Sequence, residues 1–545
     1  MSGRRSSLFS LHGNNPGRRR RIILARVLLV LLVAGVGLWF WQHEAPSTQG
    51  LAPAPPPADS VLPSTDPVLL PPTDPIRPRS TLASVDVVVY GTQTSGIAAV
   101  REITEGNPRL RVAVVSSGRF LESPLVQGLS VEDVRNASVV VGRVYREWRD
   151  AVIGYYRAHN KSPFTSSGRF VYGPQVAARF LWPLLEGSET NEVLFISGQL
   201  VAADDTGDSR YLTLRRADGS LASIDTRYFI DASVEADLAR MLGADYRVGR
   251  GEAVFNDVSG PTPPFPSQSN DFITAPQRIS ALLTLKLYGN NSAPRITQLT
   301  SPLYNPATYD SAPKLKPAVR DAFARGWSMA INRLPDQERE LNETWSDYPD
   351  VAASFNWVFD PAKRPEIRRR VVERTLNLVR DLQEHGYPHV GIANIPQYPY
   401  VREGPRVVGL TTYTSSQLVS GHSHEVVAIG CYTQYDRHDI VHPTMIDKTA
   451  YALVPMGALM VKGHPWLLVS TAVSTDYRAY SSPVRMEHTR ANMGGAAGAM
   501  VVLAARLGTE VTRVPYEQVG ELLRQRGYNL SMGPAAEGLP GVSSD

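Results

Sequence analysis

The chain has 545 residues and a formal net charge of +4 at pH 7. A chain of this length is too long for one simple core, and it indicates two interleaved domains. The small net charge excludes the basic face that a nucleic-acid groove needs, so we expect no nucleic-acid partner. The single cysteine, Cys431, excludes an intramolecular disulfide.

A basic tail followed by an apolar segment opens the chain. Residues 1–21 carry several arginines, and residues 22–42 are almost entirely apolar. About 20 residues form a helix of roughly 30 Å, which is enough to span a membrane. The positive-inside rule then predicts a single-pass anchor, with residues 1–21 in the cytoplasm and the body in the periplasm or at the cell surface. A cleaved signal peptide is the alternative, although no small-x-small motif follows Trp41.

Residues 43–80 form a linker that is rich in proline. It contains runs such as Pro55-Pro56-Pro57 and Pro71-Pro72. Such a chain is extended and cannot build a core. We interpret it as a stalk or tether in front of the folded body, which begins at residue 81.

The folded part opens with a strand, a glycine turn and a helix. The apolar run Val85 to Tyr90 enters a turn at Gly91 and leaves as an Ala-rich helix, and a second apolar run covers Leu110 to Val115. Gly91 permits the sharp turn, and Gly96 lets the helix pack close to the strand. The first amides of the helix then face a pyrophosphate, as in dinucleotide-binding units.

Two positions depart from this motif. Gln93 replaces the middle glycine, and Ser116 stands at the end of the second strand, where an acidic residue would hold a ribose. A buried parallel strand with a tight turn into a helix is therefore the alternative interpretation.

Further helices and strands follow along the body. Helical patterns cover Val131 to Tyr156 and Gln175 to Leu185. Three β-runs separated by turn residues then predict a meander, at Val193 to Ala202, Tyr211 to Arg216 and Ser223 to Ile230. Strands return from Val426, and the last helices are expected at Gly494 to Leu507 and near Tyr516 to Arg526.

The predicted fold class is α/β. A Rossmann-like nucleotide-binding domain would be built from residues 81–259, including the inserted meander, and from residues 426–530. Residues 260–425 would form a substrate or cap domain, and residues 531–545 a flexible tail.

Five segments in order carry a resemblance to a known family. They are Ile230-Asp-Ala-Ser-Val-Glu-Ala-Asp-Leu, Tyr246-Arg-Val-Gly-Arg, Tyr400-Val-Arg-Glu-Gly-Pro-Arg, Ala428-Ile-Gly-Cys-Tyr with Asp436-Arg-His438, and Val484-Arg-Met-Glu with Met493-Gly-Gly-Ala-Ala-Gly. Together with the Gly91 turn, they resemble the FAD-dependent oxidoreductases with a glutathione-reductase-like fold. Within that family the nearer resemblance is to the subgroup that includes bacterial xanthan-lyase-like proteins.

The resemblance implies FAD as the cofactor and assigns residues to it. The expected contacts with the pyrophosphate and flavin come from the glycine turn, two strand ends and the start of the last long helix. These residues are Gly91, Gln93, Ser95, Gly96, Ser116, Asp231, Ala232, Gly494, Gly495, Ala496 and Ala497. The helix that starts at Gly494 would direct its amino end at the flavin ring.

Asp436 and His438 are the expected catalytic pair, with Arg485 beside them. The two residues are two apart on an extended segment, so they should point to one face and form an acid/base pair, with His438 as the base and Asp436 as its orienting partner. Arg485 would face the flavin ring or an anionic substrate. A structural hydrogen-bonded pair is the alternative for Asp436 and His438.

Other candidate sites have simpler explanations. His422, His424, His438 and His442 match no common zinc spacing, so we expect no metal. Cys431 is expected to be a buried small residue, and Tyr398, Tyr400 and Tyr413 either line a sugar site or pack in the core.

The sequence thus predicts a membrane-anchored FAD-dependent oxidoreductase. It would transfer a hydride from a small molecule, such as a carbohydrate-like substrate, to the flavin. The alternative is a cofactor-free protein on the same scaffold that binds partners at the cell envelope.

Overall fold

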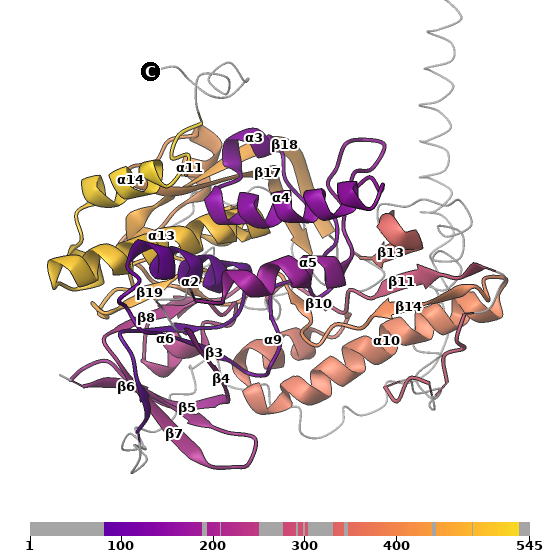
Figure 1. Cartoon of the computed structure of the whole chain (residues 1–545), viewed down its shortest axis with the longest axis horizontal. Helices are drawn as coiled ribbons and strands as arrows, with labels where there is room; N and C mark the ends of the chain where they lie inside the picture. Colours follow the sequence, from indigo (N-terminus) through magenta and orange to yellow (C-terminus); the bar gives the residue numbers. More distant parts are fainter. Residues whose placement is uncertain are drawn as a thin grey trace, which may run out of the picture. The chain divides into compact units, whose positions relative to one another are not determined.

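In the computed structural model, a five-stranded parallel sheet carries the glycine turn. Its strand order is β19-β8-β2-β3-β4, with β19 at Leu467–Val469, β8 at Tyr228–Asp231, β2 at Val87–Tyr90, β3 at Val112–Ser116 and β4 at Val193–Ser197. Helix α2, Thr94–Gly106, joins β2 to β3, which pair in parallel (Figure 1). The expected strand–turn–helix–strand unit is therefore confirmed. Both strands are buried throughout, as is usual for a parallel sheet covered on two faces.

The structure describes most of the body and leaves several segments aside. The described residues are 81–187, 193–207, 209–249, 276–289, 293–297, 300–303, 331–342, 347–438, 443–481 and 483–532. All of them belong to one unit, Thr73–Asp545. The predicted basic tail, membrane anchor and linker, at 1–80, lie outside the described residues, as does most of the predicted tail at 531–545. In the part that is described, no helix combines the length and apolar character that crossing a membrane requires.

The expected meander is present, but two of the three predicted β-runs each divide into two strands that belong to different sheets. Strands β5, Gln199–Asp204, β6, Arg210–Arg215, and β7, Leu221–Thr226, are antiparallel, and β1, Thr81–Ser84, adds to β7 in parallel. The run from Val193 breaks at Gly198 into β4 and β5. The run from Ser223 breaks at Arg227 into β7 and β8. Apolar patterning alone could not reveal these breaks, because the residues on either side are equally suited to a sheet.

Helices α4, Arg143–Ala158, and α5, Pro174–Leu181, pack together, and α4 also contacts α2. The predicted continuous helix from Val131 is wrong before Arg143, where only a short separate helix forms. Val131 forms a bridge with Val171, and a separate short helix, α3, covers Ala137–Val140. Asn136 has a left-handed backbone (φ 53°), which a continuous helix cannot contain. The helix expected at Gln175 to Leu185 corresponds to α5 and a short 3₁₀ turn after it.

The last long helix, α13, lies along α2, and small residues allow the close approach (Figure 1). Helix α13 covers Glu487–Leu507, so the predicted start at Gly494 is wrong. The apolar pattern misplaced the start because the first turns of α13 are mostly polar and yet buried. Helix α14, Tyr516–Gln525, confirms the amphipathic helix expected there.

A second sheet with its own core occupies the region expected to be the cap. Its order is β12-β13-β11-β14, with β12 at Ile331–Arg333, β13 at Glu338–Leu341, β11 at Thr284–Leu287 and β14 at Val390–Asn394. Helix α10, Arg364–Glu384, contacts β14 and α9, Val351–Phe359 (Figure 1). Trp357 joins this region to the nucleotide half, since its Nε1 donates to Glu235 at 2.7 Å. The domain boundaries at 259/260 and 425/426 stay predictions.

A long hairpin and several short pairings complete the structure. Strands β17, Val426–His438, and β18, Pro443–Pro455, are antiparallel, and β17 contacts α13. The short pairs are β9, Tyr246–Arg247, with β16, Arg406–Val407, and β10, Ile279–Ser280, with β15, Tyr400–Val401. The short helices are α6, Asp237–Met241, α11, Ser415–Ser420, and α12, Tyr477–Tyr480. The two short strand pairs bring together segments that are more than a hundred residues apart in the chain.

Candidate functional site

The turn between β2 and α2 needs glycine at two positions. Gly91 has a φ of +99°, and a Cβ there would lie 2.8 Å from the backbone nitrogen of Ser233. A Cβ on Gly96 would lie 2.3 Å from the oxygen of Gly91. Both positions therefore accept only glycine without rearrangement, which is the geometry of a dinucleotide-binding turn.

A carboxylate from elsewhere in the chain lies in this turn. The amide of Thr92, directly after Gly91, donates to Oε2 of Glu122 at 3.0 Å. The hydroxyls of Ser116 and Ser117, at the end of β3, donate to Oε1 at 3.1 and 3.0 Å. Glu122 is buried, and burial raises its pKa. The sequence shows no acidic residue at position 116, but the fold supplies one to the same place.

Asp231 and Ala232, at the end of β8, are also satisfied within the protein. The Asp231 carboxylate accepts hydrogen bonds from the amides of Ser233 and Ala239, both at 2.9 Å, and so holds the start of α6. Burial raises the pKa of Asp231 to about 7. The oxygen of Ala232 accepts a hydrogen bond from the hydroxyl of Thr471 at 2.8 Å. Both residues lie beside the Gly91 turn, as expected, and both hold the surrounding loops.

The side chains that open α2 are bonded to distant segments. The Ser95 hydroxyl lies 2.5 Å from that of Thr471. The Thr94 hydroxyl donates to Glu487, the first residue of α13. Gln93 is buried, and within the described residues its Oε1 has no hydrogen-bond partner.

The segment Gly494 to Ala497 does not start a helix, so the expected amino end directed at a flavin is not there. A Cβ on Gly494 would lie 1.9 Å from the oxygen of Ser95, and one on Gly495 would lie 2.2 Å from the hydroxyl of Tyr528. Ala496 and Ala497 are fully buried in the same stretch. These residues pack α13 against its neighbours, and Glu487 stands at the actual amino end.

Asp436 and His438 come together on β17, as its alternation predicts, and Arg485 lies beside them. Arg485 donates to Oδ2 of Asp436 at 2.6 Å, and Nε2 of His438 lies 3.5 Å from Oδ1 of Asp436. Nδ1 of His438 is 2.9 Å from Oδ2 of Asp347, a residue that no sequence motif indicated. Arg402 forms an ion pair with Asp347 at 2.9 Å. Their placement agrees with the expectation, while their catalytic roles stay predictions.

The electrostatics of this cluster favour the charged forms. Burial alone would raise the pKa of Asp436, but Arg485 and His438 outweigh it and hold the pKa below its ordinary value. Burial and Arg402 lower the pKa of His438, and the carboxylates of Asp347 and Asp436 raise it further than these lower it. The imidazole therefore keeps its proton to higher pH than a free histidine does.

A small cavity, with room for about one water molecule, is lined by residues that neighbour the cluster and the glycine turn. It is bordered by Tyr400, whose hydroxyl accepts a hydrogen bond from Arg485 at 3.0 Å, and by Glu487, which binds Thr94. The remaining lining residues are Leu125, Leu129, Val131, Glu132, Asp133, Tyr145, Tyr172, Met486 and His488. Two lining residues are therefore bonded to the two predicted parts of the site, although the described residues that border the cavity include none from the cluster or from the glycine turn itself.

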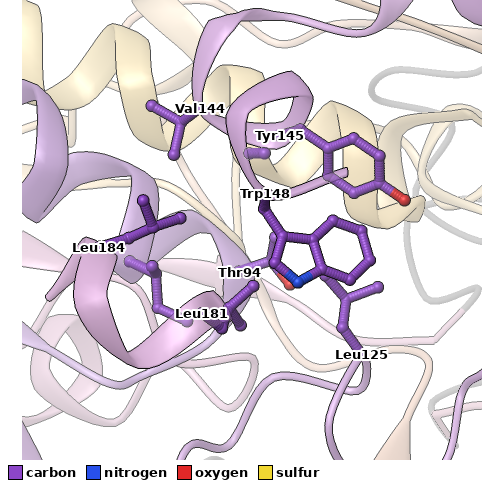
Figure 2. A pocket seen from close by; sticks show the side chains of 9 residues that line it. Thr94, Leu125, Val144, Tyr145, Trp148, Leu181 and Leu184 are labelled. Atoms are coloured by element: carbon purple, nitrogen blue, oxygen red, sulfur yellow. The ribbon is translucent and has the colours of Figure 1, made fainter. Parts of the chain in front are cut away.

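A second, apolar cavity, with room for about one water molecule, is lined by residues of α2 and α4 (Figure 2). Trp148 and Tyr145 of α4 border it together with Thr94 and Leu125. The indole Nε1 of Trp148 donates to the oxygen of Ala177 at 3.2 Å, which leaves the ring as an apolar wall. Because its lining is mostly apolar, this cavity has few groups that could bind or react with a polar ligand.

The remaining candidates keep their simpler explanations. His422 and His424 are exposed, and His442 lies outside the described residues. Among the residues that the structure describes, no group of three or more metal-ligating side chains is present. Cys431 is buried, as predicted, and burial raises the pKa of its thiol to about 12. Tyr398 and Tyr413 pack in the core, so only Tyr400 of the three tyrosines borders the cavity.

A parallel sheet whose first strand turns through glycine into a helix is the architecture of dinucleotide-binding α/β proteins. The comparison with family models identifies the family: residues 86–523 match the model described as FAD dependent oxidoreductase. The chain belongs to that family, so it is an oxidoreductase and FAD is its cofactor. No curated protein matches the chain.

Solved flavoproteins are among the structures that resemble this chain. OxyS anhydrotetracycline hydroxylase from Streptomyces rimosus is 12% identical, with a TM-score of 0.35, and the match covers 81% of this chain and 66% of that one. p-Nitrophenol 4-monooxygenase PnpA from Pseudomonas putida DLL-E4 is 10% identical (TM-score 0.38; 85% and 91% covered). A flavoprotein/dehydrogenase from Cytophaga hutchinsonii is 10% identical (TM-score 0.32; 81% and 83% covered).

The residues around the turn do not admit FAD as they stand. Ligand sites for molecules of this class usually enclose about 300–1,000 Å³, whereas each cavity described above has room for about one water molecule. Glu122 holds the Thr92 amide that would face a pyrophosphate. Cofactor binding therefore requires that this carboxylate give up its place.

Proposed function

We propose that the protein oxidises a small, oxygen-bearing substrate at the cluster of Asp436, His438 and Arg485, with FAD as the electron acceptor. The observation that carries this proposal is the position of His438 between two carboxylates, with Nδ1 at 2.9 Å from Asp347 and Nε2 at 3.5 Å from Asp436. Its side chain is 11% exposed, so the ring is held in place and still has some access to solvent. A histidine fixed through Nδ1 presents Nε2 for proton transfer.

The orienting role fits Asp347 better than Asp436. Asp347 is the nearer carboxylate, and it is itself held by the hydroxyl of Ser280 at 2.6 Å and by Arg402. Asp436 is bonded to Arg485, so it balances that charge. We infer that Asp347 fixes the imidazole, while Nε2 of the neutral ring takes a proton from a substrate hydroxyl. Because the carboxylates raise the pKa of His438, this step is favoured as the pH rises and the ring loses its proton.

The Nε–H group of Arg485 is available to donate a hydrogen bond to a substrate oxygen. Its two terminal nitrogens donate to Asp436 and Tyr400, whereas its buried Nε has no hydrogen-bond partner among the described residues. A buried guanidinium N–H without an acceptor is costly, and a hydroxyl or carboxylate oxygen of a substrate would satisfy it. This supports an oxygen-rich substrate, such as a carbohydrate-like molecule.

The cellular setting is part of the proposal. Residues 22–42 would anchor the protein in a membrane, and the proline-rich segment at 43–80 would hold the body in the periplasm or at the cell surface. The resemblance of the five sequence segments also supports placement in the xanthan-lyase-like subgroup.

A matched pair of histidine variants tests the proposal. Purified protein loaded with FAD would be screened anaerobically against alcohols and sugars, with bleaching of the flavin band as the readout. His438→Gln should lower the bleaching rate by about a hundredfold with unchanged FAD content. His464→Gln is the control, because His464 forms the same 2.9 Å pair with Asp205 away from the cluster. Equal rates for the two variants would contradict the assignment.

A further inference from the structure

The Glu122 carboxylate is hydrogen-bonded both to the glycine turn and to the end of β3. From the residues that the structure describes, four donor groups reach its carboxylate: the amides of Thr92 and Ser117 and the hydroxyls of Ser116 and Ser117. The distances lie between 3.0 and 3.4 Å. Glu122 is 5% exposed and Ser116 is also buried, whereas Ser117, which supplies two of the four donors, is exposed.

These donors are the ones that a dinucleotide would use. In units of this kind, the amides after the first glycine face the pyrophosphate, and the end of the next strand faces a ribose. Thr92 directly follows Gly91, and Ser116 is the last residue of β3. The carboxylate of Glu122 therefore takes both positions with its two oxygens.

A pyrophosphate and Glu122 cannot share this place. The Thr92 amide bonds to Oε2 of Glu122 and the other three donors bond to Oε1, so the donors that a dinucleotide would need are already taken. Two anions in a buried site repel each other, which disfavours the charged form of both. The turn also holds a free acceptor, Oε1 of Gln93, which is buried and has no partner among the described residues. That oxygen would accept a ribose hydroxyl once the turn is open.

We propose that Glu122 is an internal occupant of the anion position of the glycine turn, which FAD must displace, so that this residue sets the affinity for the cofactor. The loop that carries Glu122 is also bonded to the turn, through the Glu122 amide to the Thr92 hydroxyl at 2.9 Å and between Ser123 and Thr94 at 2.7 Å. The proposal rests on FAD being the cofactor of the proposed function.

The opposite role for Glu122 is that of the ribose-binding carboxylate that position 116 lacks. In that case its oxygens would have to accept ribose hydroxyls, and removing the carboxylate would weaken FAD binding. If Glu122 instead competes with FAD for the turn, removing its carboxylate should strengthen FAD binding. The sign of the change in affinity therefore separates the two roles.

Equilibrium titration of the full-length apoprotein with FAD, followed by flavin fluorescence, tests the inference. Glu122→Ala should bind FAD about tenfold or more tightly than the wild type. Glu122→Gln keeps the size without the charge, so it should lie between the two and guards against a folding defect in the Ala variant. Glu373→Gln, a buried carboxylate on α10, is the control and should match the wild type.

Each outcome decides something. Equal or weaker binding by Glu122→Ala overturns the inference, and clear binding by the wild type in that case leaves the proposed function intact. Absence of FAD binding by every variant overturns both. Tighter binding by Glu122→Ala together with unchanged catalysis in His438→Gln keeps the inference and overturns the proposed function.

Discussion

Nδ1 of His438 lies 2.9 Å from Oδ2 of Asp347, although the two residues are 91 positions apart. One belongs to the long hairpin and the other to the region expected to be the cap. The bond therefore ties the predicted catalytic residue to a separate part of the fold. It also leaves Nε2, at 3.5 Å from Asp436, as the less tightly held imidazole nitrogen.

Replacing Asp347 by Asn should slow turnover by about tenfold and shift its pH profile. The carboxylate raises the pKa of His438, so its loss moves the titration of the imidazole to lower pH. The pH dependence of the rate of flavin reduction would show this shift. Asp205→Asn, beside His464, is the control and should leave the profile in place. A slower enzyme with an unmoved profile would indicate a structural role only.

His488 should make the protein less stable as pH falls. Burial lowers its pKa to about 3, whereas the unfolded imidazole takes up a proton below about 6.5. Between these two pH values the unfolded state binds more protons, so stability falls by at most about 1.4 kcal/mol per pH unit. The His488→Asn variant should lose this component. Urea unfolding of both proteins at several pH values between 7 and 4 would measure the difference in slope, and parallel curves would contradict the prediction.

Gly494→Ala should destabilise the protein by about 1–3 kcal/mol through overpacking. The added Cβ would lie 1.9 Å from the oxygen of Ser95, and α2 would have to move away from α13. Gly154→Ala is the matched control, because Gly154 is also inside a helix and nothing lies within 4 Å of its Cβ position. That variant should be as stable as the wild type or more so by up to about 1 kcal/mol. Chemical denaturation of both variants decides the point.

Cys431 should resist thiol reagents in the folded protein. Its side chain is buried, and burial raises its pKa to about 12, so little thiolate forms at neutral pH. Labelling with a maleimide, followed by mass spectrometry, should be slow under native conditions and fast in denaturant. Rapid native labelling would show that β17 opens far more readily than its burial implies.

Local patterns determined much of this protein without any structure. The apolar run before Gly91 predicted a buried parallel strand and its turn into a helix, because strand, turn and helix signals lie within a dozen neighbouring residues. The alternation along β17 placed Asp436 and His438 on one face for the same reason. Five short segments, found in the family's order between Ile230 and Met493, were sufficient to predict the family.

Tertiary structure decided the rest. Asp347 reaches His438 and Glu122 reaches Thr92 across 91 and 30 residues, and no periodicity records such a contact. The buried polar start of α13 misled the apolar pattern, since burial depends on neighbours rather than on residue type. Whether the Gly91 turn receives a cofactor or an internal carboxylate is likewise a matter of which side chain the fold brings to its amides. The same backbone amides can donate to a carboxylate of the protein or to a phosphate of a cofactor, because both are anionic acceptors.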